Sequence, residues 1–205
     1  MTWATWAAFC AAAIAMLVIP GPTILLVIGQ SLGVATGRWR RVLPLVAGVA
    51  AGDALAMTVS LAGLGAVLAA SAHAFTVLKW VGAAYLVWLG IKLWRAPVGD
   101  AAPVLPPGRA ARQAFVVTAL NPKGIAFFTA FVPQFLNAGQ PFLPQAALLT
   151  VTFVSLGAVN AAAYAVLAGR LSGAVQRPAM RRGFNRLGGG VLITAGVATA
   201  AMRRA

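Results

Sequence analysis

The segment "LNPKGIAFF" (Leu120–Phe128) places an asparagine, a proline and a lysine inside an apolar run that extends from residue 114 to residue 136. Proline removes a backbone donor and disrupts a helix, and a lysine at the centre of a bilayer costs at least about 2.5 kcal/mol. An earlier apolar run carries a similar interruption, "IPGPT" (Ile19–Thr23). One proline would indicate no more than a kink in a packed membrane helix. Two breaks at matching places in two halves of a chain favour a substrate site between them.

The composition is that of an all-α integral membrane protein. Of the 205 residues, 61% are hydrophobic and 9% are charged, whereas a soluble domain has about 25% charged residues. Apolar runs of about 20 residues are typical of transmembrane helices. The N-terminal run has no basic residues before it and is too long for a signal peptide, so we expect it to be retained. We expect six spans, near residues 3–28, 42–70, 75–91, 113–136, 142–168 and 187–202.

We expect one transmembrane domain, residues 1–205, built from two inverted three-helix repeats. Residues 1–95 form the first repeat, residues 96–112 a flexible cytoplasmic linker, and residues 113–205 the second repeat. Because each half has an odd number of spans, the second half enters the membrane from the opposite side, as in many secondary transporters. The first helix of each repeat, near residues 3–28 and 113–136, is expected to be broken.

A weak internal similarity supports the two repeats. The stretch "KWVGAAYLVWLGIK" (Lys79–Lys92) can be laid on "NRLGGGVLITAGVA" (Asn185–Ala198) without a gap. The alignment pairs Gly82 with Gly188, Leu86 with Leu192, and Gly90 with Gly196.

The net charge of +14 has a membrane explanation. Most basic residues fall in alternate connections, and the positive-inside rule places those connections in the cytoplasm and both termini outside. Anionic lipid headgroups there account for the charge, so nucleic acid is not expected as a partner. The basic residues in these connections are Arg38, Arg40, Arg41, Lys92, Arg95, Arg109, Arg112, Arg170, Arg177, Arg181, Arg182 and Arg186.

Enzymatic and metal chemistry find little support in the sequence. Cys10 is the only cysteine, so the chain can form no internal disulfide and no cysteine-based metal or redox site. The expected spans contain no Ser–His pair, no pair of carboxylates and no metal-binding cluster. We therefore expect neither a cofactor nor a metal, and we do not expect an enzyme.

Two ionisable residues lie near the middle of the bilayer. Asp53 is twelve residues beyond Arg41 and Lys123 is eleven residues beyond Arg112, which at the helical rise corresponds to about 18 Å and about 16 Å. Such residues indicate a functional site by default. A structural ion pair between Asp53 and Lys123 is the alternative, and it is compatible with function. Asp53 is also the candidate for proton coupling.

A free amino acid matches this set of groups. Its carboxylate would bind at the N-terminus of a half-helix beside Lys123, and its ammonium would bind freed carbonyls near the first break, or Asp53. Asn121 and Asn160 can both donate and accept hydrogen bonds. The candidate substrate-binding residues are Pro20, Gly21, Pro22, Asp53, Asn121, Pro122, Lys123 and Asn160.

Glycines at a spacing of four residues mark faces for close helix packing. Gly48 and Gly52 form one such pair, and small residues at this spacing let helix backbones approach closely. Packing within the chain is the simpler explanation, although such faces would also permit a homodimer.

Three stretches together resemble the LysE/RhtB family of amino-acid exporters. They are "PGPTILLVIGQSLGVATGRWRRVLPLVAGVAAGD" (Pro20–Asp53), "GAAYLVWLGIKLWR" (Gly82–Arg95) and "LNPKGIAFFTAFVPQF" (Leu120–Phe135). The resemblance implies an inner-membrane efflux protein that expels amino acids, or derivatives such as homoserine or its lactone, driven by protons; in such a membrane the termini placed outside by the positive-inside rule are periplasmic. The residues that match the family's motifs are Pro20, Gly21, Pro22, Asn121, Pro122 and Lys123.

The substrate class is narrower than the family's. A basic substrate would require more than one acid within the membrane, so we expect a small neutral or polar amino acid. A passive channel for small polar solutes is the alternative, because paired broken helices can line channels too. The paired cysteines of redox relatives are absent.

Overall fold

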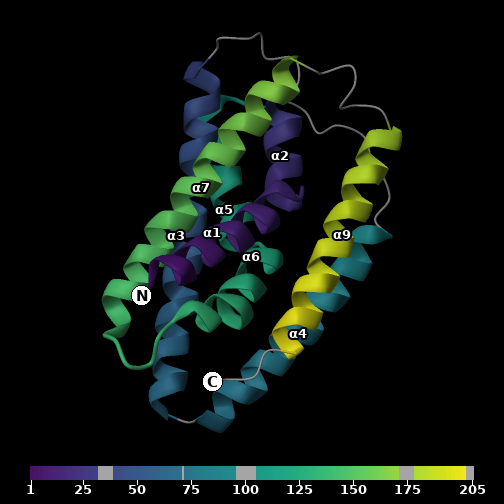
Figure 1. Ribbon diagram of the computed structural model, residues 1–205. Helices are drawn as coiled ribbons and strands as arrows, with labels where there is room; N and C mark the ends of the chain where they lie inside the picture. The colour runs from purple at the N-terminus through teal and green to yellow at the C-terminus, as the bar shows by residue number, and fades with distance from the viewer. Residues whose placement is uncertain (32–38, 71, 96–104, 171–177, 202–205) are drawn as a thin grey trace.

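Helices account for all regular structure in the described part of the chain, which comprises residues 1–31, 39–70, 72–95, 105–170 and 178–201 of the computed structural model (Figure 1). The elements are α1 (Trp3–Val18), α2 (Pro22–Ser31), α3 (Trp39–Ala70), α4 (Ala72–Trp94), α5 (Pro107–Ala119), α6 (Pro122–Ala126), a π-helix (Phe127–Phe131), a 3-10 helix (Val132–Phe135), α7 (Phe142–Arg170) and α9 (Pro178–Ala201).

Both expected breaks are present. The axes of α1 and α2 differ by 56° around the short connection at residues 19–21. Pro20 and Pro22 cause this bend, because neither can donate the hydrogen bond that a continuous helix requires there. The second break separates α5 from α6 at Leu120 and Asn121. Beyond α6 the chain continues as a π-helix and then a 3-10 helix, geometries that often occur at functional sites.

Three helices in the described part are long and apolar enough to cross a membrane: Arg40–Gly63, the broken stretch Pro107–Phe135, and Phe142–Arg170. The bent pair of α1 and α2 makes a fourth when counted as one span. The chain is therefore a multi-pass helical membrane protein. Many side chains of α4 and α9 lie outside the described residues, so the count of six spans stays a prediction.

Two helices begin earlier than the apolar pattern predicts. α5 begins at Pro107, six residues before the expected span, and α9 begins at Pro178, nine residues before it. Proline at the first position is preorganised for a helix, and arginines can extend their charged groups toward the membrane surface. The last six residues assigned to the linker are thus helical, while residues 96–104 lie outside the described part, as do Arg38 and Arg177.

Opposite ends of the bundle differ in charge. The end of α2, the start of α3 and the end of α7 lie at one end, and the start of α1 and the end of α9 lie at the other (Figure 1). Arg40 and Arg41 begin α3, and Arg170 ends α7. This arrangement agrees with basic residues on one side of the membrane and both termini on the other.

Contacts between helices follow the pattern expected of two related halves. α4 packs along α9, and α3 packs against α7. α3 also packs against α5, and its counterpart α7 packs against α1 and α2. When the two halves are exchanged, the contacts of α4 with α9 and of α3 with α7 are unchanged. The contact of α3 with α5 becomes that of α7 with α1 and α2.

Two close backbone contacts between α4 and α9 are also exchanged when one half is laid on the other, residue by residue. A Cβ atom added to Gly90 would lie 2.6 Å from the Gly189 carbonyl oxygen, and one added to Gly196 would lie 2.7 Å from the Ala83 carbonyl oxygen. The internal alignment lays Gly90 on Gly196 and Ala83 on Gly189, so it converts one contact into the other. We propose on this basis that the halves are inverted repeats.

Gly48 and Gly52 allow α3 to approach α5 closely. A Cβ atom at Gly48 would overlap the Ala111 carbonyl oxygen, and one at Gly52 would lie 2.7 Å from the Thr118 Cβ atom. Packing within the chain thus accounts for this glycine pair. It also fixes the neighbouring Asp53 at the junction of the two halves.

We expect Gly48→Ala to lower the free energy of unfolding by about 1–3 kcal/mol, because the added methyl group can be accommodated only if α3 and α5 separate. Thermal unfolding of the purified protein in detergent would measure the effect. Gly29→Ala is the matched control, since a Cβ atom there would meet nothing within 4 Å. Equal unfolding midpoints for the two variants would contradict the packing role.

Two apolar clusters lie on either side of Asp53 along α3. An aromatic cluster contains Met57 and the buried rings of Phe9, Phe127, Phe128, Phe131 and Phe153. An aliphatic cluster contains Val49, Val42, Leu45, Val27 and small residues of α5 and α7. Asp53 lies between Val49 and Met57 in sequence, so the polar site is enclosed by apolar packing toward both ends of the helix.

Candidate substrate site

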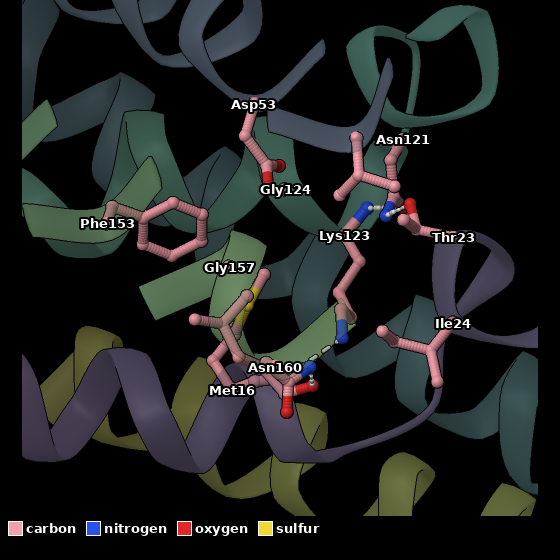
Figure 2. Close-up of a pocket in the computed structure, with 13 residues that line it drawn as sticks. Met16, Thr23, Ile24, Asp53, Asn121, Lys123, Gly124, Phe153, Gly157 and Asn160 are labelled. Carbon is pink, nitrogen blue, oxygen red and sulfur yellow. Dashed lines mark hydrogen bonds between the residues drawn. The ribbon is translucent and has the colours of Figure 1, made fainter. Parts of the chain in front are cut away.

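A small cavity lies where the two broken helices meet α3 and α7 (Figure 2). It encloses about 30 Å³, which is room for about two water molecules and too little for an amino acid. The structure therefore represents a closed state. The lining residues are Met16, Leu17, Gly21, Thr23, Ile24, Val49, Asp53, Asn121, Lys123, Gly124, Phe153, Gly157 and Asn160.

Lys123 binds the end of α1. Its side chain is 5% exposed, and its Nζ atom donates to the Met16 carbonyl oxygen at 3.0 Å (Figure 2) and to the Ile19 carbonyl oxygen at 2.9 Å. In a continuous helix the Met16 carbonyl would accept from the backbone of residue 20, but Pro20 has no N–H group. The lysine thus supplies donors that the proline break has removed.

Side chains of α7 bind the two carbonyls in between. The Asn160 Nδ2 atom donates to the Leu17 carbonyl oxygen at 3.0 Å, and the Tyr164 hydroxyl donates to the Val18 carbonyl oxygen. The usual partner of the Val18 carbonyl would be the backbone N–H of residue 22, which is again a proline. All four carbonyls at the end of α1 are therefore satisfied by side chains from the second half of the chain.

Asn121 joins the two breaks. Its Oδ1 atom accepts from the backbone N–H of Lys123 at 3.1 Å and so caps the start of α6. Its Nδ2 atom donates to the Thr23 hydroxyl at 3.2 Å, and that hydroxyl lies 3.2 Å from the Thr118 hydroxyl. A chain of polar contacts thus connects the start of α2 with the end of α5.

The N-terminus of α2 also faces the cavity. The first hydrogen bond of this helix runs from the Leu25 N–H group to the Gly21 carbonyl oxygen at 2.9 Å. The preceding N–H groups, of Thr23 and Ile24, have no partner within the helix, and both residues line the cavity. Such a helix end favours an anion.

Asp53 lies across the cavity from these helix ends. Its side chain is 8% exposed, and its Oδ2 atom lies against Gly157, where an added Cβ atom would be 2.8 Å away. The Lys123 ammonium points toward the α1 carbonyls and away from Asp53 (Figure 2). The ion pair between Asp53 and Lys123, considered as an alternative, is therefore not formed in this closed state.

We expect Gly157→Ala to displace the Asp53 carboxylate, because the added methyl group would overlap its oxygen atom. Accumulation driven by the proton gradient should fall by at least about tenfold, which corresponds to about 1.4 kcal/mol, while the protein still inserts into the membrane. Transport in membrane vesicles, compared with Gly29→Ala, would measure this. A Gly157→Ala variant with the control's activity would show that the position of Asp53 tolerates displacement.

The structure brings together five of the eight candidate residues. Gly21, Asp53, Asn121, Lys123 and Asn160 all line the cavity. The three candidate prolines do not line it and act through the backbone that they interrupt.

Three residues at the site, Thr23, Tyr164 and Gly157, were not predicted from the sequence. Thr23 belongs to the "PGPT" motif, and Tyr164 follows Asn160 by four residues, a spacing that places both on one face of α7. A search for polar residues at this spacing would have found Tyr164. A glycine beside a buried carboxylate leaves no comparable signal.

A multi-pass helical protein with a polar site between two broken helices has the architecture of a membrane transporter. The model of the family described as "LysE type translocator" matches residues 14–203. The chain belongs to this family, and it is a transporter and not an enzyme.

Relatives of the chain include named efflux proteins. The homoserine/homoserine lactone efflux protein of Salmonella typhimurium is 34% identical over 171 residues, which cover 82% of this chain and 83% of the relative. The leucine efflux protein of Salmonella choleraesuis is 28% identical over 162 residues, covering 77% and 75%. An uncharacterized membrane protein of Vibrio cholerae is 33% identical over 200 residues, covering 94% of each chain. No solved structure matches the chain.

Proposed function

We propose that this protein exports a small neutral or polar amino acid, or a derivative such as homoserine or its lactone, across the bacterial inner membrane. Export would proceed by alternating access coupled to protons, with both termini in the periplasm. The family and the names of two relatives, which export homoserine or its lactone and leucine, support this proposal.

One observation carries the proposal: two helix ends of opposite polarity lie at a single cavity. Met16 and Leu17 at the end of α1 line the cavity, as do Thr23 and Ile24 at the start of α2. A free amino acid carries both an ammonium and a carboxylate. The carbonyls would bind the ammonium, and the N–H groups, with the positive end of the α2 dipole, would bind the carboxylate.

The remaining lining favours a neutral side chain. Val49, Ile24 and Phe153 provide apolar surface, and Asn160 offers a polar group. Asp53 is the only acid among the lining residues, and its proposed role is to carry the proton. A basic substrate would need a further acid, since a buried cation must be paired.

The closed cavity supports alternating access over a permanent pore. Buried residues of the aromatic and aliphatic clusters enclose it on both sides along the chain, and its volume of about 30 Å³ admits no amino acid. In the proposed cycle, substrate enters and leaves through separate openings of the two clusters.

Uptake into inside-out membrane vesicles tests the proposal. Vesicles with and without the protein would be given labelled homoserine, homoserine lactone, leucine and lysine, with and without an acidic interior. We expect accumulation of one neutral substrate above the external concentration only when the gradient is present. Equilibration without accumulation would refute proton-coupled export and favour the channel, and transport of none of the four would refute amino-acid export.

A further inference from the structure

We propose that Lys123 acts as a tethered substitute for the ammonium group of the substrate. In the empty protein the Nζ atom of Lys123 is hydrogen-bonded to carbonyls that the substrate ammonium would otherwise bind. When the substrate binds, its ammonium displaces Lys123 from these carbonyls. This inference rests on the proposed function and adds a mechanism for the return of the empty transporter.

The chemical match is close. A lysine side chain ends in a primary ammonium with three donors, as does a free amino acid. The Lys123 Nζ atom lies 3.0 Å and 2.9 Å from the Met16 and Ile19 carbonyl oxygens, which are normal hydrogen-bond distances. The intervening carbonyls of α1 bind neutral donors, Asn160 and Tyr164. Within the described part of the chain, the site is thus arranged for one cation.

Two ammonium groups cannot share these carbonyls. Like charges in a small buried space repel strongly, and the cavity of about 30 Å³ is too small for both. A substrate that binds the carbonyls must therefore displace Lys123. The displaced ammonium has two acidic partners available, the substrate carboxylate and the carboxyl group of Asp53 across the cavity.

The local structure allows this movement. The backbone of Lys123 is held by the Asn121 cap, whereas the outer part of its side chain crosses Gly21. A Cβ atom at Gly21 would lie 3.2 Å from the Lys123 Cε atom and 3.3 Å from its Nζ atom. The missing side chain at Gly21 thus leaves the space through which the ammonium reaches the carbonyls.

Lys123 would make closure of the empty site favourable. Without a cation, closure would bury the Met16 and Ile19 carbonyls without donors, which is strongly unfavourable. With Lys123 in place, the empty transporter can close and return to the cytoplasmic side. An exporter that lacked this group could return only with substrate bound, and it would exchange substrate without net export.

The ligands named for one relative fit this view. Homoserine and its lactone share the α-ammonium group, but ring closure removes the carboxylate of the lactone. A transporter that handles both, as that relative's name states, must recognise a group that they share. The ammonium is the only charged group common to the two.

The test separates exchange from net export in proteoliposomes containing the full-length protein. Lys123→Met keeps an unbranched side chain but removes the charge. For the amino acid that the wild type transports, we expect exchange of labelled for unlabelled substrate to stay within about threefold, while net efflux falls at least about 100-fold, as expected when two buried carbonyls lose their donors. Lys92→Met, which removes an exposed lysine beside Trp88, should leave both rates unchanged.

Lys123→Ala provides a second measurement. Added n-propylammonium should restore net efflux in this variant by supplying a free ammonium to the carbonyls, and 1-propanol at the same concentration should not. Loss of both exchange and net efflux in a monodisperse Lys123→Met protein would overturn the inference, as would unchanged net efflux or failure of n-propylammonium to rescue Lys123→Ala. A wild-type protein that exchanged no amino acid would instead refute the proposed function.

Discussion

Replacing both Pro20 and Pro22 by alanine is expected to abolish export while the protein stays folded in the membrane. Alanine restores the two backbone N–H groups that the prolines lack, so the carbonyls of Met16 and Val18 gain donors within the helix. α1 and α2 should then join into one helix, without the present bend of 56°. Both helix ends that face the cavity would disappear.

The expected effect on transport is large and the effect on stability is small or opposite. Net export should fall at least about 100-fold, or about 2.7 kcal/mol in the barrier, because the ammonium and carboxylate sites are lost together. A proline inside a helix costs about 3 kcal/mol or more, so the unfolding midpoint should be unchanged or higher. Vesicle transport and circular dichroism of the purified protein would measure the two effects.

Pro44→Ala is the matched control for this double variant. Pro44 lies inside α3 without breaking it and does not line the cavity, so its replacement should leave export intact. If the double variant exported at the rate of Pro44→Ala, the break at Pro20 and Pro22 would be a kink without a role in binding. The hydrogen bonds to the carbonyls at the end of α1 would then stabilise the fold and would have no role in binding substrate.

The two breaks could be predicted from the sequence because they follow from local chemistry: proline interrupts a helix wherever it stands. The fixed helical rise also places Asp53 and Lys123 near mid-bilayer from their distance to the flanking arginines, and this depth stays a prediction. The structure brings both residues to one cavity. The effect of proline and the helical rise per residue do not depend on how the helices are arranged.

The partners of Lys123 could not be read from the sequence, because they depend on how the two halves cross. From the sequence we expected Lys123 beside the substrate carboxylate. We expected the substrate ammonium to bind the carbonyls near the first break. In the closed state Lys123 itself donates to two of those carbonyls, and the Tyr164 hydroxyl of α7 donates to the Val18 carbonyl oxygen. Such contacts join residues more than 100 positions apart, and helical spacing carries no information at that range.

Two helices extend beyond the spans expected from hydropathy, for a different physical reason. α5 and α9 begin before the expected spans because hydropathy alone rejects arginine-containing turns. Helices of membrane proteins continue through the headgroup region, where arginine is favourable.

Asp53→Asn is expected to uncouple transport from the proton gradient without stopping it. Asparagine has nearly the shape of aspartate but cannot release a proton. Asp53 is the only acid among the residues that line the cavity, so no second carboxyl group there can take over the role. Accumulation in inside-out vesicles should fall to equilibration, while exchange of labelled for unlabelled substrate continues.

Proton movement can be measured directly in proteoliposomes that contain a pH-sensitive dye. Substrate added to one side should change the internal pH for the wild type and should not for Asp53→Asn. The only other acid of the chain is Asp100, so Asp100→Asn is a natural control and should behave as the wild type.

Coupling follows from the geometry if the substrate moves Lys123 toward Asp53. An ammonium brought close to a carboxyl group favours its ionised form, so substrate binding would expel the proton and substrate release would readmit it. Asp53→Asn breaks this link but leaves the carbonyls of α1 and the N-terminus of α2 in place. Unchanged dependence on the proton gradient in this variant would therefore exclude Asp53 as the proton carrier, and complete loss of exchange would assign it to substrate binding alone.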